Sequence, residues 1–475
     1  MKNIFKIIIL ILPSILILCL PLKAIPIDCI TIVEKRLLAI FVLAVIFWIA
    51  EPIPIFSTSV LIIFLELVMI SDKGLIFFSS TNMPVDTFGT LIDYRAIIHT
   101  FAEPIIILFL GGYFLAIAAT KYRLDNNLAK ILLKPFGTNP NYVLLGLMII
   151  TATFSMFMSN TATTAMMLAI LTPVLAHFDK NDPGCKAFII AIPFAANVGG
   201  LGTPIGTPPN AVAMKYLTND LSITFAQWMS FGVPFAFILL IFTWFILLKL
   251  YSPQTKSLKI DISDTFLKTP QAITVYITFT ATILLWLTGK IHGINSYIVA
   301  MLPIATFTAT GIIGAKDLKL LSWDVLWLVS GGIALGLGME QTGLSTHIIN
   351  MIPFTEVSPL ILILIATILT ITMATFMSNT ATANLLMPIM VAIGTSFSNL
   401  KDFGGGKMLL IGVAFSASLA MTLPVSTPPN AMAHATGILK SGDMIKPGLI
   451  VGVAGILMTY TLLYIMVKFG FFNLQ

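Results

Sequence analysis

Residues 157–163 read Phe-Met-Ser-Asn-Thr-Ala-Thr, and the same seven residues return at 376–382. A second pair of related stretches follows, Pro-Ile-Gly-Thr-Pro-Pro-Asn-Ala at 204–211 and Pro-Val-Ser-Thr-Pro-Pro-Asn-Ala at 424–431. The serine of each heptad precedes the threonine of its Thr-Pro-Pro-Asn stretch by 48 residues in the first half and by 49 in the second. The chain is therefore an internal duplication, with polar, helix-breaking residues at matching places.

The composition is that of an integral membrane protein. Of the 475 residues, 57% are hydrophobic and only 10% are charged, whereas soluble domains carry roughly 25% charged residues. Successive apolar runs of about 20 residues, the length of a membrane-spanning helix, cover most of the chain. The net charge of +6 is dispersed over loops, which argues against nucleic-acid binding, and the three cysteines lack the spacing of a disulfide framework or a zinc site.

The runs predict an all-α fold of about 11 transmembrane helices plus two re-entrant helical hairpins. Residues 1–30 hold a first transmembrane helix with a cytoplasmic amino terminus, and a cleaved signal peptide over residues 1–26 is the alternative. Residues 31–251 form a first repeat, 252–268 a polar connection and 269–475 a second repeat. An odd number of crossings separates the hairpins, so the repeats have inverted topology, and the distribution of Lys and Arg agrees with the positive-inside rule.

Each repeat contains two interrupted segments. We expect hairpins at about 143–177 and 360–393, because each arm beside the Ser-Asn-Thr interruption is too short to cross a membrane. Broken helices are expected at about 187–217 and 408–437, around the Thr-Pro-Pro-Asn stretches. Irregular backbone at membrane depth lines a wet cavity or is buried in protein, so the four interruptions indicate a transport site.

The hairpin tips suit carboxylates, because a new helix begins just after each Ser-Asn-Thr and presents free N–H groups and its positive dipole end. Two such sockets, neither needing Arg or Lys, suit a ligand with two anionic ends. The predicted substrate residues are Ser159, Asn160, Thr161, Thr207, Ser378, Asn379, Thr380, Thr427 and Pro428.

The interruptions also offer the hard oxygen ligands that Na⁺ favours, namely hydroxyls, amide oxygens and carbonyls freed before the prolines. The predicted Na⁺ ligands are Ser155, Ser159, Asn160, Gly206, Ser378, Asn379 and Ser426. Ordinary helix packing explains one isolated Ser-Asn-Thr well, but it explains two identical heptads with matched partners poorly.

These paired motifs resemble the divalent anion/sodium symporter family of dicarboxylate, citrate and sulfate transporters, and the resemblance extends over nearly the whole chain. It implies a homodimer in the cell membrane, with a scaffold domain and a transport domain that moves as an elevator. It also implies that the Ser-Asn-Thr tips bind substrate carboxylates and Na⁺. One departure is Ala374, which stands where the first half has Ser155 and where relatives can carry a hydroxyl.

The predicted function is Na⁺-coupled symport of C4 dicarboxylates such as succinate, malate or fumarate. Na⁺ is the coupling ion, no organic cofactor is expected, and the protein is not an enzyme. Sodium-independent dicarboxylate exchange, and transport of sulfate or citrate, are the alternatives within the same fold. An ion channel and a membrane enzyme are the alternatives from other classes, and no hydrolase or metalloprotease motif supports the latter.

Overall fold

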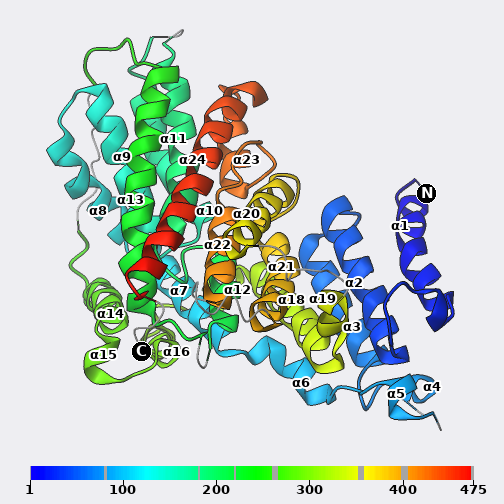
Figure 1. Ribbon diagram of the computed structural model, residues 1–475. Helices are drawn as coiled ribbons and strands as arrows, with labels where there is room; N and C mark the ends of the chain where they lie inside the picture. Colours follow the sequence, from blue (N-terminus) through cyan, green and yellow to red (C-terminus); the bar gives the residue numbers. More distant parts are fainter. Residues whose placement is uncertain are drawn as a thin grey trace.

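The computed structural model describes residues 2–79, 83–179, 182–218, 221–258, 266–350, 358–396 and 405–471 (Figure 1). These residues contain helices and no strand beyond an isolated bridge between Ser71 and Ile92. The prediction of an all-α protein is therefore confirmed.

The amino-terminal helices lie at one end of the molecule, on the right in Figure 1. A capping box between Thr31 and Glu34 starts α2, and Glu51 in the left-handed conformation ends it before the two prolines that precede α3. The helices here are α1 (Lys2–Cys19), α2 (Ile32–Ala50), α3 (Ile55–Met69), α4 (Ile76–Ser79), α5 (Val85–Phe88) and α6 (Tyr94–His99).

The next part of the chain holds the first pair of interrupted segments. Prolines stand at the first position of several of its helices, where the missing N–H costs no hydrogen bond. The helices are α7 (Pro104–Lys121), α8 (Leu124–Leu133), α9 (Pro140–Ser155), α10 (Asn160–Leu175), α11 (Gly184–Gly200), α12 (Pro208–Tyr216) and α13 (Phe225–Leu250).

The last part holds the second pair of interrupted segments. Its helices are α14 (Pro270–Leu287), α15 (Gly289–His292), α16 (Ser296–Val299), α17 (Met301–Ala309), α18 (Trp323–Thr342), α19 (Leu344–Asn350), α20 (Pro359–Phe376), α21 (Asn379–Ser396), α22 (Gly406–Ser418), α23 (Pro428–His434) and α24 (Ser441–Lys468). A short 3₁₀ helix, η5 (Asp317–Leu320), precedes α18.

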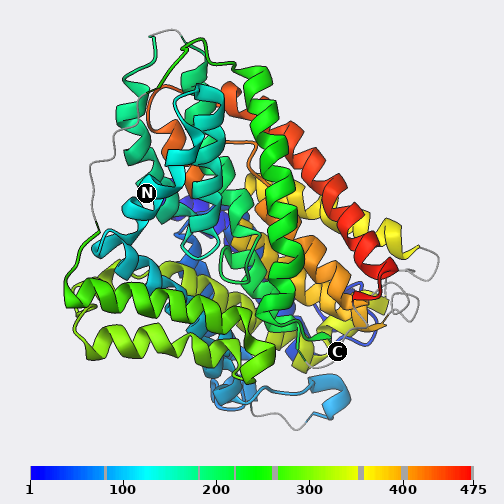
Figure 2. The ribbon, with the colours of Figure 1, turned by 90° about the vertical axis from the view of Figure 1, so that its left-hand side faces the viewer.

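Five helical stretches in the described part of the chain are long and apolar enough to cross a membrane: 94–121, α13, α14, α20 and α24. Two of these stretches, α13 and α24, contact each other and are drawn in green and red in Figure 2. Large apolar side chains such as Phe64, Phe245, Ile277 and Leu457 are exposed, which suits contact with lipid. The helices α9, α10 and α11 are shorter, as expected of interrupted segments.

Two apolar cores organise the helices. The larger joins α9, α11 and α13 with α22 and α24, and α11 is buried along most of its length. The second joins α2 and α3 with α18 and α21. Helix α18 thus lies between the amino-terminal helices and the interrupted ones.

Candidate functional site

The first Ser-Asn-Thr motif forms the turn between α9 and α10. Helix α9 ends at Ser155 and α10 begins at Asn160. The Ser159 hydroxyl caps α10 by accepting a hydrogen bond from the Ala162 N–H at 3.2 Å, and Thr161 is exposed in the first turn. The first N–H groups of a helix have no partner within it, so this turn presents the positive end of α10.

The second motif forms the corresponding turn between α20 and α21. The Ser378 hydroxyl accepts from the Ala381 N–H at 3.4 Å, and α21 begins at Asn379. Thr380 is buried, unlike its exposed counterpart in the first motif. The Asn379 Oδ1 atom is buried and has no hydrogen-bond partner within the described residues. A buried acceptor without a donor is rare in proteins and marks a place where a ligand or water can bind.

The Thr-Pro-Pro-Asn stretches start helices α12 and α23. Thr207 and Thr427 both adopt an extended conformation just before the first proline. The Thr427 hydroxyl accepts from the Asn430 N–H at 3.2 Å, whereas Thr207 makes no capping bond. Pro428, the first residue of α23, is exposed.

The asparagine of each stretch fastens the irregular segment that precedes it. The Asn210 amide donates to the carbonyls of Gly200 and Thr203 at 3.0 and 2.9 Å. The Asn430 amide donates in the same way to the Met421 carbonyl at 2.8 Å. The duplicated sequence therefore forms the same set of side-chain to backbone hydrogen bonds twice, which explains why asparagine follows both proline pairs.

Asn197 of α11 connects the two halves. Its Nδ2 atom donates to Thr427 Oγ1 at 3.2 Å and to Asn430 Oδ1 at 3.4 Å, and its Oδ1 atom accepts from Asn160 Nδ2 at 3.4 Å. The side chain is 2% exposed. Sequence reasoning did not select Asn197, although a lone asparagine that follows an apolar run in a membrane helix is a signal for a polar contact.

The helices near the interruptions pack crosswise between the halves. Helix α10 contacts α23, and α12 contacts α21. Ser418 Oγ at the end of α22 lies 3.5 Å from Thr207 Oγ1. The structure therefore brings the first tip next to the second break, and the start of α12 next to the helix that follows the second tip.

Four oxygen-bearing groups meet beside the first tip. The outer end of the Asn160 amide lies 2.6 Å from Ser155 Oγ, 3.0 Å from the Gly206 carbonyl and 3.2 Å from the Ala196 carbonyl. The neighbouring acceptors favour the orientation with the nitrogen in that place, where the amide donates to both carbonyls and to Ser155. With its oxygen there instead, its nitrogen donates to Asn197 Oδ1 and the four groups form an all-oxygen set suited to a hard cation. A methyl group on Gly200 would come within 2.8 Å of Asn160 Oδ1 and 3.0 Å of the Gly206 oxygen, so only glycine leaves this space open.

The second half does not repeat this arrangement. Ser426 Oγ donates to the Thr375 carbonyl at 2.9 Å, and the Thr375 hydroxyl donates to its own helix at 2.7 Å. Ala374, Ala417 and Ala420 form a small buried apolar cluster. Within the described residues no hydrogen bond joins the three predicted ligands of the second half, Ser378, Asn379 and Ser426.

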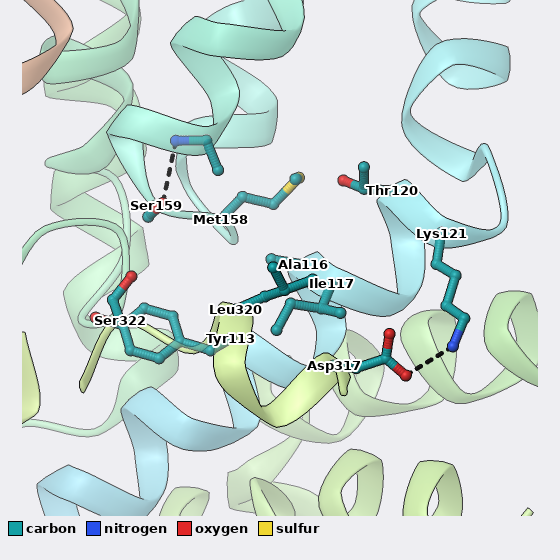
Figure 3. A pocket seen from close by; sticks show the side chains of 11 residues that line it. Tyr113, Ala116, Ile117, Thr120, Lys121, Met158, Ser159, Asp317, Leu320 and Ser322 are labelled. Carbon is teal, nitrogen blue, oxygen red and sulfur yellow. Dashed lines mark hydrogen bonds and ion pairs between the residues drawn. The ribbon is translucent and has the colours of Figure 1, made fainter. Parts of the chain in front are cut away.

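A cavity of about 450 Å³ lies beside the first tip (Figure 3). Of the nine predicted substrate residues, only Ser159 lines it. The walls come from the tip, from α7 and from the segment of η5 that leads to α18: Met158, Ser159 and Ala162, then Tyr113, Ala116, Ile117, Thr120 and Lys121, then Asp317, Leu320 and Ser322.

This cavity contains a basic side chain, which the sequence interpretation did not expect. Lys121 Nζ lies 2.7 Å from Asp317 Oδ2 and 2.8 Å from the Ile312 carbonyl. The Gly314 N–H and then Lys121 hold the pKa of Asp317 below its ordinary value, so the pair is ionic at neutral pH. Figure 3 shows this pair on the opposite side of the cavity from Ser159.

Residues 1–469 match the family model described as the sodium:sulfate symporter transmembrane region. The chain belongs to this family. The membership predicted from the duplicated motifs is thus confirmed, and this member of the sodium:sulfate symporter family is a multi-pass membrane transporter and not an enzyme.

Relatives of this family member include transporters from bacteria. It is 33% identical over 397 residues to an uncharacterized transporter of Haemophilus influenzae, covering 79% of this chain and 83% of the relative. It is 31% identical over 471 residues to the sodium-dependent dicarboxylate transporter SdcS of Staphylococcus saprophyticus, covering 90% and 86%. The structure of the Alcanivorax borkumensis YdaH transporter has a similar fold, with a TM-score of 0.53 at 14% identity over 92% of this chain and 99% of that one.

Proposed function

We propose that this protein carries C4 dicarboxylates such as succinate, malate or fumarate across the membrane together with Na⁺. The observation that carries the proposal is the convergence of the Asn160 amide, the Ser155 hydroxyl and two carbonyls at the amino-terminal end of α10. With the Asn160 oxygen turned toward them these groups suit a hard cation, and the helix end suits a carboxylate, so the first tip and the break beside it provide for both solutes. The name of the Staphylococcus relative, a sodium-dependent dicarboxylate transporter, supports the same pair.

We assign the substrate to the two tips and the two breaks: Ser159, Asn160, Thr161, Thr207, Ser378, Asn379, Thr380, Thr427 and Pro428. Na⁺ binds first at Ser155, Ser159, Asn160 and Gly206, and more weakly at Ser378, Asn379 and Ser426. The buried, unpartnered Asn379 Oδ1 supports a ligand at the second tip. The cavity beside Ser159 provides the access route to the first tip.

The proposed mechanism is an elevator in a homodimer. Residues 31–251 and 269–475 form inverted repeats, the interrupted helices form the transport domain, and the amino terminus lies in the cytoplasm. The crosswise packing of α10 on α23 and of α12 on α21 supports this assignment, because it makes the interrupted helices of both repeats one packed unit. Na⁺ and dicarboxylate then cross together, since each contributes to filling the same polar centre.

A sodium-independent dicarboxylate exchanger is the second candidate. The alanine cluster of the second half favours it, because that cluster stands where a second hydroxyl-lined cation site would lie. Sulfate or citrate in place of a C4 dicarboxylate would use the same sockets.

Uptake of labelled succinate into proteoliposomes separates these functions. Symport predicts that replacing Na⁺ by K⁺ or choline abolishes uptake, and unchanged uptake refutes it. Uptake that requires internal dicarboxylate, and proceeds without Na⁺, establishes exchange, while competition by sulfate or citrate measures specificity.

The site itself is tested by Asn160→Ala and Asn379→Ala, which we expect to abolish uptake in folded protein. Asn139→Ala is the matched control, because Asn139 also begins a helix, α9, but is exposed at the far end of the same hairpin. Wild-type uptake in both site variants contradicts the assignment.

A further inference from the structure

Glu66 is a carboxyl group buried in a membrane helix and unused by the proposed transport mechanism. It lies in α3, whose other fourteen residues are uncharged, and it is 0% exposed. Neither carboxyl oxygen has a hydrogen-bond partner within the described part of the chain. An ionised carboxylate left unpaired in an apolar interior costs far more than its neutral form, and an ionisable residue within a membrane span is a candidate functional group.

The surroundings of the carboxyl are apolar and close-packed. A methyl group on Gly338 of α18 would come within 3.1 Å of Glu66 Oε1 and 2.9 Å of Leu37 Cδ1 of α2. Seven residues earlier Gly331 packs against Ser59 of α3 in the same way, and the Ser59 hydroxyl is also buried without a partner among the residues that the structure describes. No side chain of α2 or α18 therefore compensates a negative charge on Glu66.

Lys215 of α12 is the cation whose charge acts on Glu66. Its Nζ donates to the Ile333 carbonyl of α18 at 3.4 Å and lies 4.9 Å from the ring of Tyr216, and it forms no ion pair among the described residues. The charge of Lys215 also interacts electrostatically with Glu103 and Glu340. Lys215 is thus near Glu66, but it is not bonded to it.

Two other charged groups near α3, Arg36 and Glu34, already bind groups other than Glu66. Arg36 of α2 donates to the carbonyls of Met69 and Phe78 at 3.1 and 2.7 Å, and Glu34 pairs with His347 at 2.8 Å. The titratable groups on the elements packed against α3, and those that share the charge of Lys215, are Glu34, Lys35, Arg36, Tyr94, Arg95, His99, Glu103, Lys215, Asp324 and Glu340.

We propose that Glu66 is an intramembrane proton-binding site, neutral in this arrangement, and that the distance of Lys215 decides when its proton leaves. When the ammonium approaches, the O–H bond of Glu66 breaks, the proton passes to water, and a carboxylate–ammonium pair remains. No other bond changes. Lys215 is the next-to-last residue of α12, the helix that follows the first break. A movement of α12 therefore changes the distance from Lys215 to Glu66, and with it the fraction of Glu66 that is protonated.

Infrared titration of the purified protein tests this without substrate. We expect a protonated-carboxyl C=O band at pH 7 that is absent in Glu66→Gln and disappears only well above the ordinary range of carboxyl titration, about pH 4. Glu51→Gln is the matched control, because Glu51 is exposed at the end of α2 and its loss leaves the band in place. Absence of the band from the wild type at pH 7, or its persistence in Glu66→Gln, overturns the proposal.

Lys215→Met tests the partner. Removing an opposite charge raises the pH at which the band disappears, by about one unit, a tenfold change in proton affinity. An unchanged midpoint overturns the role of Lys215.

Uptake in proteoliposomes above pH 7 tests whether the proton site is coupled to transport. We expect uptake by the wild type to vary with pH and uptake by Glu66→Gln to be constant. The same pH profile in both proteins shows that the proton site is not coupled to transport. If the wild type and all variants fail to take up succinate while the wild type still shows the band, the proposed substrate is wrong and the proton site is not affected.

Discussion

Gly200→Ala is the most direct test of the cation site that we propose at the first tip. The added methyl group would lie 2.8 Å from Asn160 Oδ1 and 3.0 Å from the Gly206 carbonyl oxygen. Ordinary van der Waals contact needs about 3.5 Å or more, so one of the two oxygens must move. The Asn160 amide cannot move freely, because it is bonded to Ser155 at 2.6 Å and to Asn197 at 3.4 Å.

The expected magnitude follows from the cost of overpacking, about 1 to 3 kcal/mol. If the bound state bears that cost, Na⁺ affinity falls by about 5- to 150-fold. The apparent Na⁺ constant for succinate uptake should rise accordingly. The Na⁺-dependent rise in melting temperature should also shift to higher Na⁺ concentration, because a ligand that binds the folded state stabilises it by mass action.

Gly112→Ala is the matched control, because a methyl group there would meet only the Ile205 side chain, with its flexible Cδ1 end at 3.4 Å and its Cβ at 4.0 Å. It places the same group on a neighbouring membrane helix, α7, and should leave Na⁺ dependence unchanged. Should Gly200→Ala fold and bind Na⁺ as the wild type does, the cation cannot lie among Ser155, Asn160 and Gly206.

Three further outcomes follow from the same contacts. Asn197→Leu removes three hydrogen bonds of 3.2 to 3.4 Å. At about 0.5 to 1 kcal/mol for each bond, the rate of uptake should fall roughly 30-fold. Unchanged uptake would refute the link between the halves. Asp182 is buried, but hydrogen bonds from Thr255, Gln254 and Gly184 keep its pKa low. The Asp182 carboxylate therefore stabilises the fold fully above about pH 4, and this stabilisation is lost as the pH falls. The melting temperature of Asp182→Asn should be below that of the wild type by an amount that shrinks in acid, and a constant difference contradicts this. Asp317→Asn leaves the charge of Lys121 uncompensated in the cavity and should lower the KM for dicarboxylate about two- to fivefold at low salt but not at high salt; a salt-independent KM excludes Lys121 from the access route.

Much of the local structure could be predicted from the sequence. The motif residues cap α10 and α21 and break α11 and α22 because Ser, Asn, Thr and Pro act through neighbouring backbone atoms, and those effects need no tertiary contact. The start of α2 has a local signal of the same kind, the capping box of Thr31 and Glu34.

The surroundings of the motifs could not be predicted in the same way. Lys121 lines the cavity at the first tip because α7 and η5 meet there, and neither element carries a local signal for that meeting. Asn197 lies 37 residues after Asn160, and its bonds to Thr427 and Asn430 depend on how α11 packs against α23. Contacts between distant elements are decided by packing, which a repeated motif does not encode.

The duplication has diverged where the proposed cation would bind. Aligning the heptads sets Ser155 against Ala374, and aligning the Thr-Pro-Pro-Asn stretches sets Asn197 against Ala417. In the first half these positions supply a hydroxyl and an amide to the polar centre, whereas in the second half they form an apolar cluster with Ala420. Two identical tips therefore lie in unlike environments. The first has a hydroxyl and two carbonyl oxygens around its asparagine, and the second has an Asn379 oxygen without a hydrogen-bond partner among the described residues. An incomplete second site favours a transporter whose tight cation binding is confined to the first tip, with the second tip left mainly to the substrate.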